Sequence, residues 1–443
     1  MFSKQFSLFL KRIYRAICAR VLKMYNSSLC IRKNSKYSLK PFRYKCTCFS
    51  PDNEKLPHPR SGHRIAADSM NFYSFGGYNP LIRLEDYHYE DDSYIDSYPL
   101  FQELWRFNFA SRKWTKFRNR PTLPEVLVSN AVILHRNILM VYGGTGSPFG
   151  TRCSNQLYIC NINDDTNPMI EVKSTGQLPL PQYGQAIVYH NEYLYVIGGT
   201  TGFEYTCDIH RLNIKTFDWE IVYLCNGQGD YEPEGRYRHE VGFDGKRIFV
   251  LAGGTADIVY DMANIPVFDI ETKVWICQKT IPDHKYDTPR ARRCHGAAQI
   301  DHGNAVEVFI TGGTDGVSIF SDLWRLNLKT LQWTFFERCE LPQPTYFHAV
   351  TITPEGRLYV FGGIFSVNDE VRRSNAVYST WVCVPKLSEI CWEAVLQYSP
   401  SISKFSADDL INSGMPKKFV KRLDCNKTCT YYTWILFHLK ICY

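Results

Sequence analysis

An arginine followed three residues later by a histidine occurs at three widely separated points of the chain. The sequences are Arg60-Ser-Gly-His63, Arg236-Tyr-Arg-His239 and Arg292-Arg-Cys-His295. A guanidinium group offers planar, paired N–H donors that match a carboxylate, so a cluster of arginines is suited to binding an anion end-on. Two related segments, Gln182-Tyr-Gly-Gln185 and Thr345-Tyr-Phe-His348, carry a tyrosine at the second place. Tyrosine rings would supply rigid walls for such a site.

The sequence contains no pattern that favours catalysis or a bound cofactor. No nucleophile motif, phosphate-binding loop or spaced pair of carboxylates stands out, and each frame histidine is expected to be a loop residue. Cys46 with Cys48, and Cys425 with Cys429, lack a second pair of zinc ligands. We therefore predict a non-catalytic binding protein, with no metal ion and no cofactor.

The segments between these arginines form an internal repeat. A pair of glycines ends an aromatic or aliphatic run six times, and the first glycines lie 50 to 67 residues apart. They are Gly76, Gly143, Gly198, Gly253, Gly312 and Gly362. A tryptophan follows in most units, at Trp114, Trp219, Trp275 and Trp333; in the first unit a longer loop around residues 79–99 precedes it.

This pattern resembles the kelch repeat, which predicts an all-β fold, a six-bladed β-propeller over residues 41–385. The glycines would allow positive φ where a side chain would clash with the next blade, and the tryptophans would pack between blades. The second unit has no tryptophan near residues 167–172, so it is expected to pack less tightly. A strand from residues 41–56 is expected to complete the last blade.

Equivalent loops of a propeller lie around the mouth of its channel. We therefore predict that five arginines converge there as a cationic basin, walled by three tyrosines. They are Arg60, Arg236, Arg238, Arg292 and Arg293, with Tyr183, Tyr237 and Tyr346. Arg236 and Arg292 hold equivalent repeat positions and are favoured as carboxylate ligands.

The apolar spacing becomes helical after Pro385. Leu387, Cys391 and Val395 recur every fourth residue, which places them on one helix face. Ser406 is predicted to cap a second helix. A further apolar series consists of Met415, Pro416, Phe419 and Leu423. Such helices usually pack on their own domain, although an apolar face can also enter a partner's groove.

Charge is unevenly distributed. Residues 1–50 carry twelve lysines and arginines and no acid, so the total of +7 leaves −5 for the rest of the chain. The basic residues belong to the leader and not to the folded part, so no nucleic-acid partner is predicted. No apolar run is long enough to span a bilayer, and no membrane association is predicted. We interpret residues 1–40 as a disordered extension, with mitochondrial targeting as the alternative. Residues 425–443 are unassigned.

Several segments are longer and more specific than the general kelch-repeat pattern. Pro59-Arg-Ser-Gly-His63, Phe75-Gly-Gly-Tyr-Asn-Pro80 and Ala291-Arg-Arg-Cys-His295 are similar to kelch domain-containing receptors of cullin-2 ubiquitin ligases, over about residues 57–423. This resemblance implies a propeller that binds C-terminal degrons ending in glycine. It implies that residues 386–424 bind elongin B/C through Leu387, Cys391 and Val395, although Lys386 replaces the usual Ser, Thr or Pro. Cullin-2 would bind through Met415, Pro416, Phe419 and Leu423, and its RING subunit would join the complex with it.

Two other functions remain open. The propeller could be a non-degradative signalling scaffold for a folded phosphatase or kinase, or an actin-binding kelch protein. Co-purification of elongin B/C through the tail would favour the ligase receptor over the scaffold. The expected location is the cytoplasm, with the nucleus as a second compartment.

Overall fold

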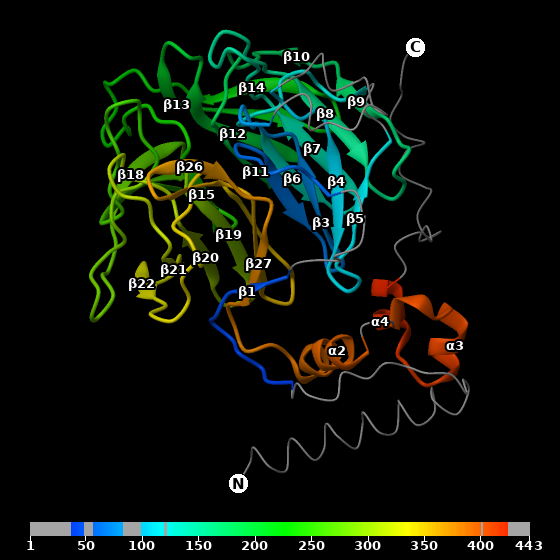
Figure 1. Ribbon diagram of the computed structural model, residues 1–443. Coiled ribbons are helices and arrows are strands. Elements are labelled where there is room, and N and C mark those ends of the chain that lie inside the picture. Colours follow the sequence, from blue (N-terminus) through cyan, green and yellow to red (C-terminus); the bar gives the residue numbers. More distant parts are fainter. Residues whose placement is uncertain (1–36, 48–55, 83–98, 119–121, 400–401, 424–443) are drawn as a thin grey trace.

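Six β-sheets surround one axis, and a group of short helices lies beside the ring (Figure 1). The computed structural model describes residues 37–47, 56–82, 99–118, 122–399 and 402–423. The innermost strands contact one another in a closed circle, in the order β2, β6, β11, β15, β19 and β23, and then β2 again. The predicted all-β, six-bladed propeller is confirmed. The leader up to residue 36 and the tail 425–443 lie outside the described residues.

Each blade is a meander that runs from the axis outward. The first three blades contain β2 (Arg64–Ala67), β3 (Asn71–Phe75), β4 (Leu104–Asn108) and β5 (Trp114–Lys116); β6 (Ala131–His135), β7 (Ile138–Tyr142), β8 (Leu157–Asn161) and β9 (Met169–Val172); and β11 (Ala186–His190), β12 (Tyr193–Thr200), β13 (Tyr205–Asn213) and β14 (Asp218–Tyr223). A short strand, β10 (Thr175–Gly176), pairs in parallel with β14 at the outer edge of the third blade.

The last three blades follow the same plan. They contain β15 (Glu240–Phe243), β16 (Arg247–Leu251), β17 (Asn264–Asp269) and β18 (Val274–Lys279); β19 (Gly296–Asp301), β20 (Val306–Thr311), β21 (Leu323–Asn327) and β22 (Gln332–Phe335); and β23 (Ala349–Ile352), β24 (Arg357–Phe361), β27 (Val377–Trp381) and β1 (Lys45–Cys46). A hairpin of β25 (Ile364–Val367) and β26 (Glu370–Arg373) projects from the sixth blade. Because β1 pairs antiparallel with β27, the N-terminal segment closes the ring, as expected.

The paired glycines lie where adjacent blades approach most closely. Gly76 has φ of 69°, and a Cβ there would lie 2.2 Å from the carbonyl oxygen of Leu127 in the second blade. The N–H of Gly77 donates to that same carbonyl at 2.9 Å. The predicted role of the diglycine, positive φ beside a neighbouring blade, is therefore confirmed at this junction.

The tryptophans fill the interfaces between blades. Trp333 of the fifth blade is fully buried against fourth-blade residues such as Ile265, and its Nε1–H donates to the carbonyl of Met262 at 3.2 Å. In the second blade, Met169 takes the tryptophan's place and is buried against Leu104 of the first blade. The expected looser packing of this blade is not seen at that position, because the long thioether side chain fills the same interface.

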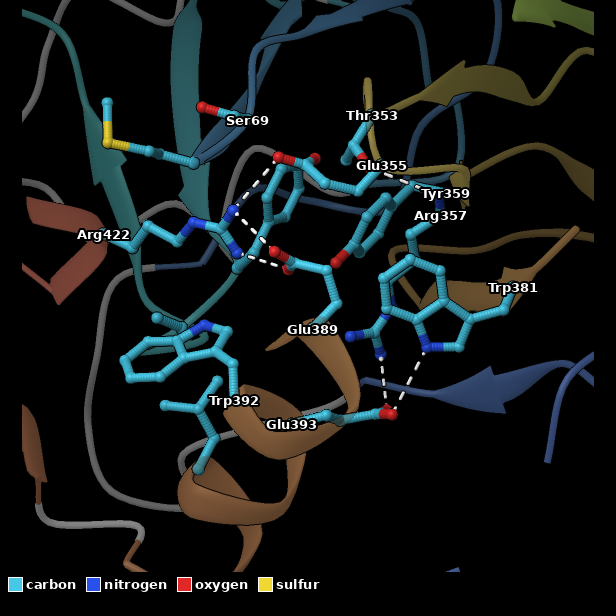
Figure 2. Close-up of a pocket in the computed structure, with 14 residues that line it drawn as sticks. Ser69, Thr353, Glu355, Arg357, Tyr359, Trp381, Glu389, Trp392, Glu393 and Arg422 are labelled. Carbon is cyan, nitrogen blue, oxygen red and sulfur yellow. Dashed lines mark hydrogen bonds and ion pairs between the residues drawn. The ribbon is translucent and has the colours of Figure 1, made fainter. Parts of the chain in front are cut away.

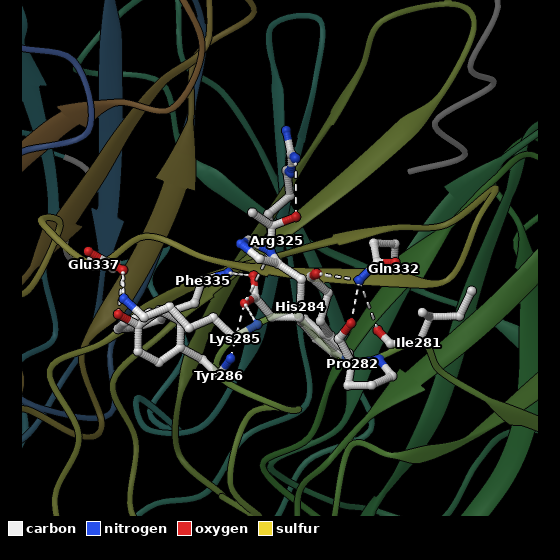
Figure 3. A network of polar contacts seen from close by, with 12 residues as sticks. Ile281, Pro282, His284, Lys285, Tyr286, Arg325, Gln332, Phe335 and Glu337 are labelled. Atoms are coloured by element: carbon white, nitrogen blue, oxygen red, sulfur yellow. Dashed lines mark hydrogen bonds and ion pairs between the residues drawn. The ribbon is translucent and has the colours of Figure 1, made fainter.

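Added segments cover some outer strand edges. The connection between the fourth and fifth blades runs along β22, where Ile281 forms a parallel bridge with Gln332. The buried carboxylate of Asp283 accepts hydrogen bonds from the backbone N–H groups of Lys285, Tyr286 and Phe335 (Figure 3). These bonds hold the pKa of Asp283 below its usual value although burial alone would raise it. The covered edge of β22 is thereby protected from pairing with other chains.

The two faces of the propeller have different loops. One side of the propeller carries the connections between the second and third strands and the loops that lead into each first strand. We call this side the upper face. The lower face carries the remaining connections. The tail, with α2 (Leu387–Tyr398), α3 (Ala407–Asn412) and α4 (Lys417–Leu423), lies against lower-face loops of the first and sixth blades (Figure 1). The predicted Ser406 cap of α3 is confirmed, since its Oγ accepts the N–H of Asp409 at 3.1 Å.

Candidate binding face and docking helix

A closed circle of backbone hydrogen bonds forms the mouth of the channel on the upper face. The third residue of each frame, and Ser129 at the equivalent place in the second blade, donates its N–H to the carbonyl of the corresponding residue in a neighbouring blade, at 2.8 to 3.2 Å. In order, the residues are Gly62, Phe347, Cys294, Arg238, Gly184 and Ser129, which returns to Gly62. All six have positive φ, between 53° and 70°. We call this circle the mouth ring; it holds the frame loops of all six blades at fixed distances.

Three of the five predicted arginines do not reach the mouth. Arg60 and Arg292 are fully buried within their blades. Arg60 pairs with Glu103 at 2.7 Å, and Arg292 forms two bonds with the carboxylate of Asp322 at 2.6 and 2.7 Å. Arg236 is buried as well and bonds backbone carbonyls, with its guanidinium 3.9 Å from the centre of the Tyr260 ring. The prediction that these arginines form an open basin is wrong, because each one is used to hold its own blade.

The acidic partners reveal a signal that sequence reasoning missed. Glu103 and Asp322 each stand two residues before a tryptophan, Trp105 or Trp324, whose indole N–H donates to the same carboxylate. Burial would raise the pKa of Glu103, but Arg60 and Lys116 outweigh it and hold the pKa below its usual value. Both acids belong to the pattern acid-Leu-Trp. In these two blades the pattern indicates that the first arginine of the frame forms an ion pair inside its own blade.

Arg238 does lie at the centre of the mouth. Its guanidinium bonds the Ser129 hydroxyl of the second blade and stacks 4.6 Å from the centre of the Phe347 ring of the sixth. Burial, with a contribution from nearby Arg64, lowers its pKa to about 10. Arg64 itself spans the channel to Glu240 of the fourth blade, at 2.6 Å. Among the described residues, no carboxylate lies within ion-pair distance of Arg238, and its Nε–H has no hydrogen-bond partner. Glu240, which pairs with Arg64, acts on Arg238 only at longer range.

Two further arginines lie on the upper face beside the mouth ring. Arg293 bonds the carbonyls of Thr255 and Ala256, and Arg373 bonds the Ser61 hydroxyl at 3.0 Å and lies over the Tyr78 ring. Neither has a carboxylate partner in the part of the chain that the structure describes. Arg373 was not predicted to belong to the site, and it lies on the β25–β26 hairpin. The adjacent Asn368 and Asp369, both at positive φ, form the turn of this hairpin, and such a residue pair could have indicated it from the sequence.

The three predicted tyrosines stand at the second frame position, half-buried on the upper face. Tyr183 and Tyr237 approach edge to face, with ring centres 6.1 Å apart, and Tyr205 adds a third ring 5.4 Å from Tyr237. Tyr346 lies 5.5 Å from Phe347. Burial raises the pKa of Tyr237 to about 12, so its hydroxyl stays a neutral donor. The mouth thus combines aromatic walls with Arg238, Arg293 and Arg373.

The fourth frame residues pack between blades: the imidazole of His63 lies against Gly362 of the sixth blade, and that of His239 lies against Gly198 of the third. The histidines at this position are His63, His239, His295 and His348. All are buried, and burial lowers the pKa of His239 to about 3 and of His348 to about 4, which keeps both neutral. The channel beside the innermost strands encloses about 390 Å³. No group of His, Cys, Asp or Glu among the described residues has a metal-binding arrangement.

The helix α2 is fixed to the lower face by its acidic side (Figure 2). Glu393 accepts bonds from Trp381 and Tyr37, at 3.3 and 2.8 Å, and lies 3.5 Å from Arg357 and Lys45. The pocket at this junction holds only about 40 Å³, enough for water but not for a ligand. α2 is therefore a firmly held element.

The opposite side of α2 carries the predicted docking residues. Leu387 is 48% exposed, Cys391 is half-buried, and Val395 packs against the tail's own core. The second predicted series behaves differently. Met415, Phe419 and Leu423 are buried in that core, where Phe419 stacks on Trp392 at 5.1 Å. Of that series only Pro416 is exposed, so the expected surface role of its apolar members is corrected to an internal one. In the described part of the chain, each helix is too short or too polar to traverse a lipid bilayer.

Comparison with known proteins identifies the family. The model of the KLHDC2/KLHL20/DRC7 Kelch-repeats domain matches residues 93–304 and 228–402. The chain is 39% identical to kelch domain-containing protein 10 of Xenopus laevis, over 85% of this chain and 88% of the relative. The chain belongs to the kelch-repeat family.

Two other relatives support the same family assignment. The human kelch domain-containing protein 10 is 39% identical over 83% of this chain and 80% of its own length. The Drosophila melanogaster homolog is 42% identical over 83% of this chain, which spans 62% of that longer relative. Kelch propellers are typically non-catalytic, and none of these three relatives carries the name of an enzyme.

Proposed function

We propose that this kelch protein is the substrate-recognition subunit of a cullin-2–elongin B/C ubiquitin ligase. The propeller's upper face binds protein C-termini ending in glycine, and the tail on the lower face binds elongin B/C. Ubiquitination and proteasomal degradation of the bound protein follow. The proposed location is the cytoplasm, with the nucleus as a second compartment. The observation that carries the proposal is α2, a helix anchored on one side that leaves Leu387 exposed on the other.

The geometry of α2 supports docking rather than simple packing. A tail helix that served only its own domain would bury its apolar residues, yet Leu387 stands in solvent beside half-buried Cys391. A small residue one turn after an exposed leucine allows a partner helix to approach closely. Cullin-2 would meet the outer surface of α4 near Pro416, with Met415, Phe419 and Leu423 holding that surface in place.

The chemistry of the upper face supports binding of a carboxylate. Arg238 is a buried cation with no carboxylate partner among the described residues, and Arg293 and Arg373 add charge beside it. A terminal carboxylate would compensate this charge with bidentate hydrogen bonds. Glycine as the last residue suits this site, since it adds no side chain between the carboxylate and the aromatic walls formed by Tyr183, Tyr237 and Tyr346.

The proposal is tested by isolating the protein's partners from cells. Full-length protein and a variant truncated at Pro385 are purified, and bound proteins are identified by mass spectrometry. We expect elongin B, elongin C and cullin-2 with the full chain and none of them with the truncation. Loss of these partners from the full chain, with a phosphatase or kinase retained by both forms, would replace the ligase receptor by the scaffold.

A further inference from the structure

The loops between the second and third strands each carry an exposed apolar side chain. One such residue occurs in every blade, and the six are between 47% and 96% exposed. They are Leu81, Phe149, Phe203, Ile258, Val317 and Val371. Single exposed apolar residues are common on proteins, but here one recurs in the same connection of all six blades, on one face. We call this set the apolar rim.

Local hydrogen bonds hold several of the rim residues at the tips of tight turns. The Thr201 hydroxyl accepts the N–H of Phe203, and the carboxylate of Asp315 accepts the N–H of Val317 at 3.0 Å. The loops of the second and third blades also touch, because the Cys153 thiol lies 3.4 Å from the carbonyl of Thr201. The turns therefore present the apolar groups in a fixed arrangement, which lowers the entropic cost of binding.

The rim encloses the mouth, and the two differ in chemistry. The mouth carries Arg238, Arg293 and Arg373, whereas the rim contributes one exposed apolar side chain from the loop between the second and third strands of each blade. One ligand that could contact both the cationic mouth and the apolar rim is the C-terminal segment of a polypeptide, with its terminal carboxylate in the mouth. Residues upstream of that end must then leave between the tips of the rim.

We propose that the apolar rim binds apolar side chains of the substrate a few residues upstream of its C-terminal glycine. The inference rests on the proposed function and adds a substrate class to it: unfolded C-terminal tails with an apolar segment before the terminus. Charge complementarity at the mouth places the carboxylate inside the ring, and the rim then selects among tails that share the same terminal residue.

The test uses four fluorescent peptides of one length and full-length protein. All end in glycine; two carry leucines at several upstream positions and two carry serines there, each as the free acid and as the amide. In fluorescence polarisation, the leucine acid is expected to bind about tenfold more tightly than the serine acid, a difference of about 1.4 kcal/mol. This preference should fall to about threefold or less in a Phe203→Ser, Val317→Ser double variant.

Val274→Ser is the matched control, since Val274 is 51% exposed and is the first residue of β18, next to the lower face. The Val274→Ser variant should keep the leucine preference. Because Phe203, Val317 and Val274 are all exposed, neither the double variant nor the control should change the melting temperature. Discrimination of acid from amide without a leucine preference would overturn the rim inference and leave the proposed function standing. Equal binding of acid and amide would overturn both. Self-association lost in the double variant would assign the rim to a second copy and also overturn the inference.

Discussion

The guanidinium of Arg422 on α4 donates two hydrogen bonds to the carboxylate of Glu389 on α2, at 2.6 and 3.1 Å. A third bond, at 3.1 Å, joins the same guanidinium to Glu355 of the propeller (Figure 2). One side chain thus connects the last helix, the docking helix and the sixth blade. Glu389 is 6% exposed, so its charge depends on Arg422 for compensation.

Replacing this guanidinium should loosen the tail. Arg422→Gln leaves the buried Glu389 carboxylate without its cation, at a cost of about 3–5 kcal/mol to tail docking. In hydrogen exchange measured by mass spectrometry, α4 and α2 should lose protection while the propeller strands keep theirs. Lys421→Gln, which changes an exposed neighbour on the same helix, is the control. Unchanged protection in α4 would show that the ion pair does not hold the tail.

Elongin docking should depend on the exposed side of α2. Leu387→Ala combined with Cys391→Phe removes an anchor worth about 2 kcal/mol and blocks close approach of the partner. Co-purified elongin B/C should disappear while the melting temperature stays the same, because Leu387 contributes little to the protein's own core. Leu410→Ala, which truncates a side chain buried in the tail core, should instead lower tail stability. Full retention of elongin by the double variant would contradict the docking assignment.

The arginines should separate into binding and structural residues. Arg238→Ala should weaken binding of a glycine-terminated acid peptide at least about tenfold, since a charge-assisted bond contributes about 1.5–3 kcal/mol. Arg292→Ala should mainly destabilise the fifth blade, because it removes the cation that pairs with Asp322 and the donor to the carbonyl of Gly312. Peptide titration and thermal unfolding of both variants distinguish the two roles. Normal affinity in folded Arg238→Ala would exclude this residue as the carboxylate ligand.

The buried histidines should make the propeller sensitive to acid. Their pKa values are lowered in the folded state, so below about pH 6.5 the unfolded chain binds more protons and stability falls as the pH falls. For His348, with a folded pKa of about 4, the slope approaches about 1.4 kcal/mol per pH unit between these values. His348→Gln should reduce the loss of unfolding temperature between pH 7 and pH 5.

Glutamine is a reasonable substitute at this position because Gln185 occupies it in the third blade, where its amide donates to the carbonyl of Tyr142 at 3.0 Å. His284→Gln, on a side chain that is 90% exposed, serves as the control and should leave the pH dependence unaltered. An identical acid response in all three proteins would rule out buried His348 as a source of acid sensitivity.

Spacing along the chain was sufficient to predict the propeller. Diglycines such as Gly76-Gly77 and tryptophans such as Trp333 act through backbone conformation and packing that every repeat shares, so their recurrence reports the architecture directly. The same holds for the tail, where the four-residue spacing from Leu387 predicted a helix and Ser406 predicted a cap. Closure by a strand near Lys45 followed from the missing fourth strand of the last blade.

Only the tertiary structure decided which arginines are available. Arg60 and Arg238 both belong to frame loops, yet one meets Glu103 inside its blade while the other crosses the mouth to Ser129. The partner lies 43 residues away in the first case and 109 in the second, and local spacing carries no information about such distant contacts. The sequence determined where every loop stands around the ring, because repeats stack by nearest-neighbour packing. The direction of each side chain depended on which distant group it could bond, a carboxylate for Arg60 and a hydroxyl for Arg238.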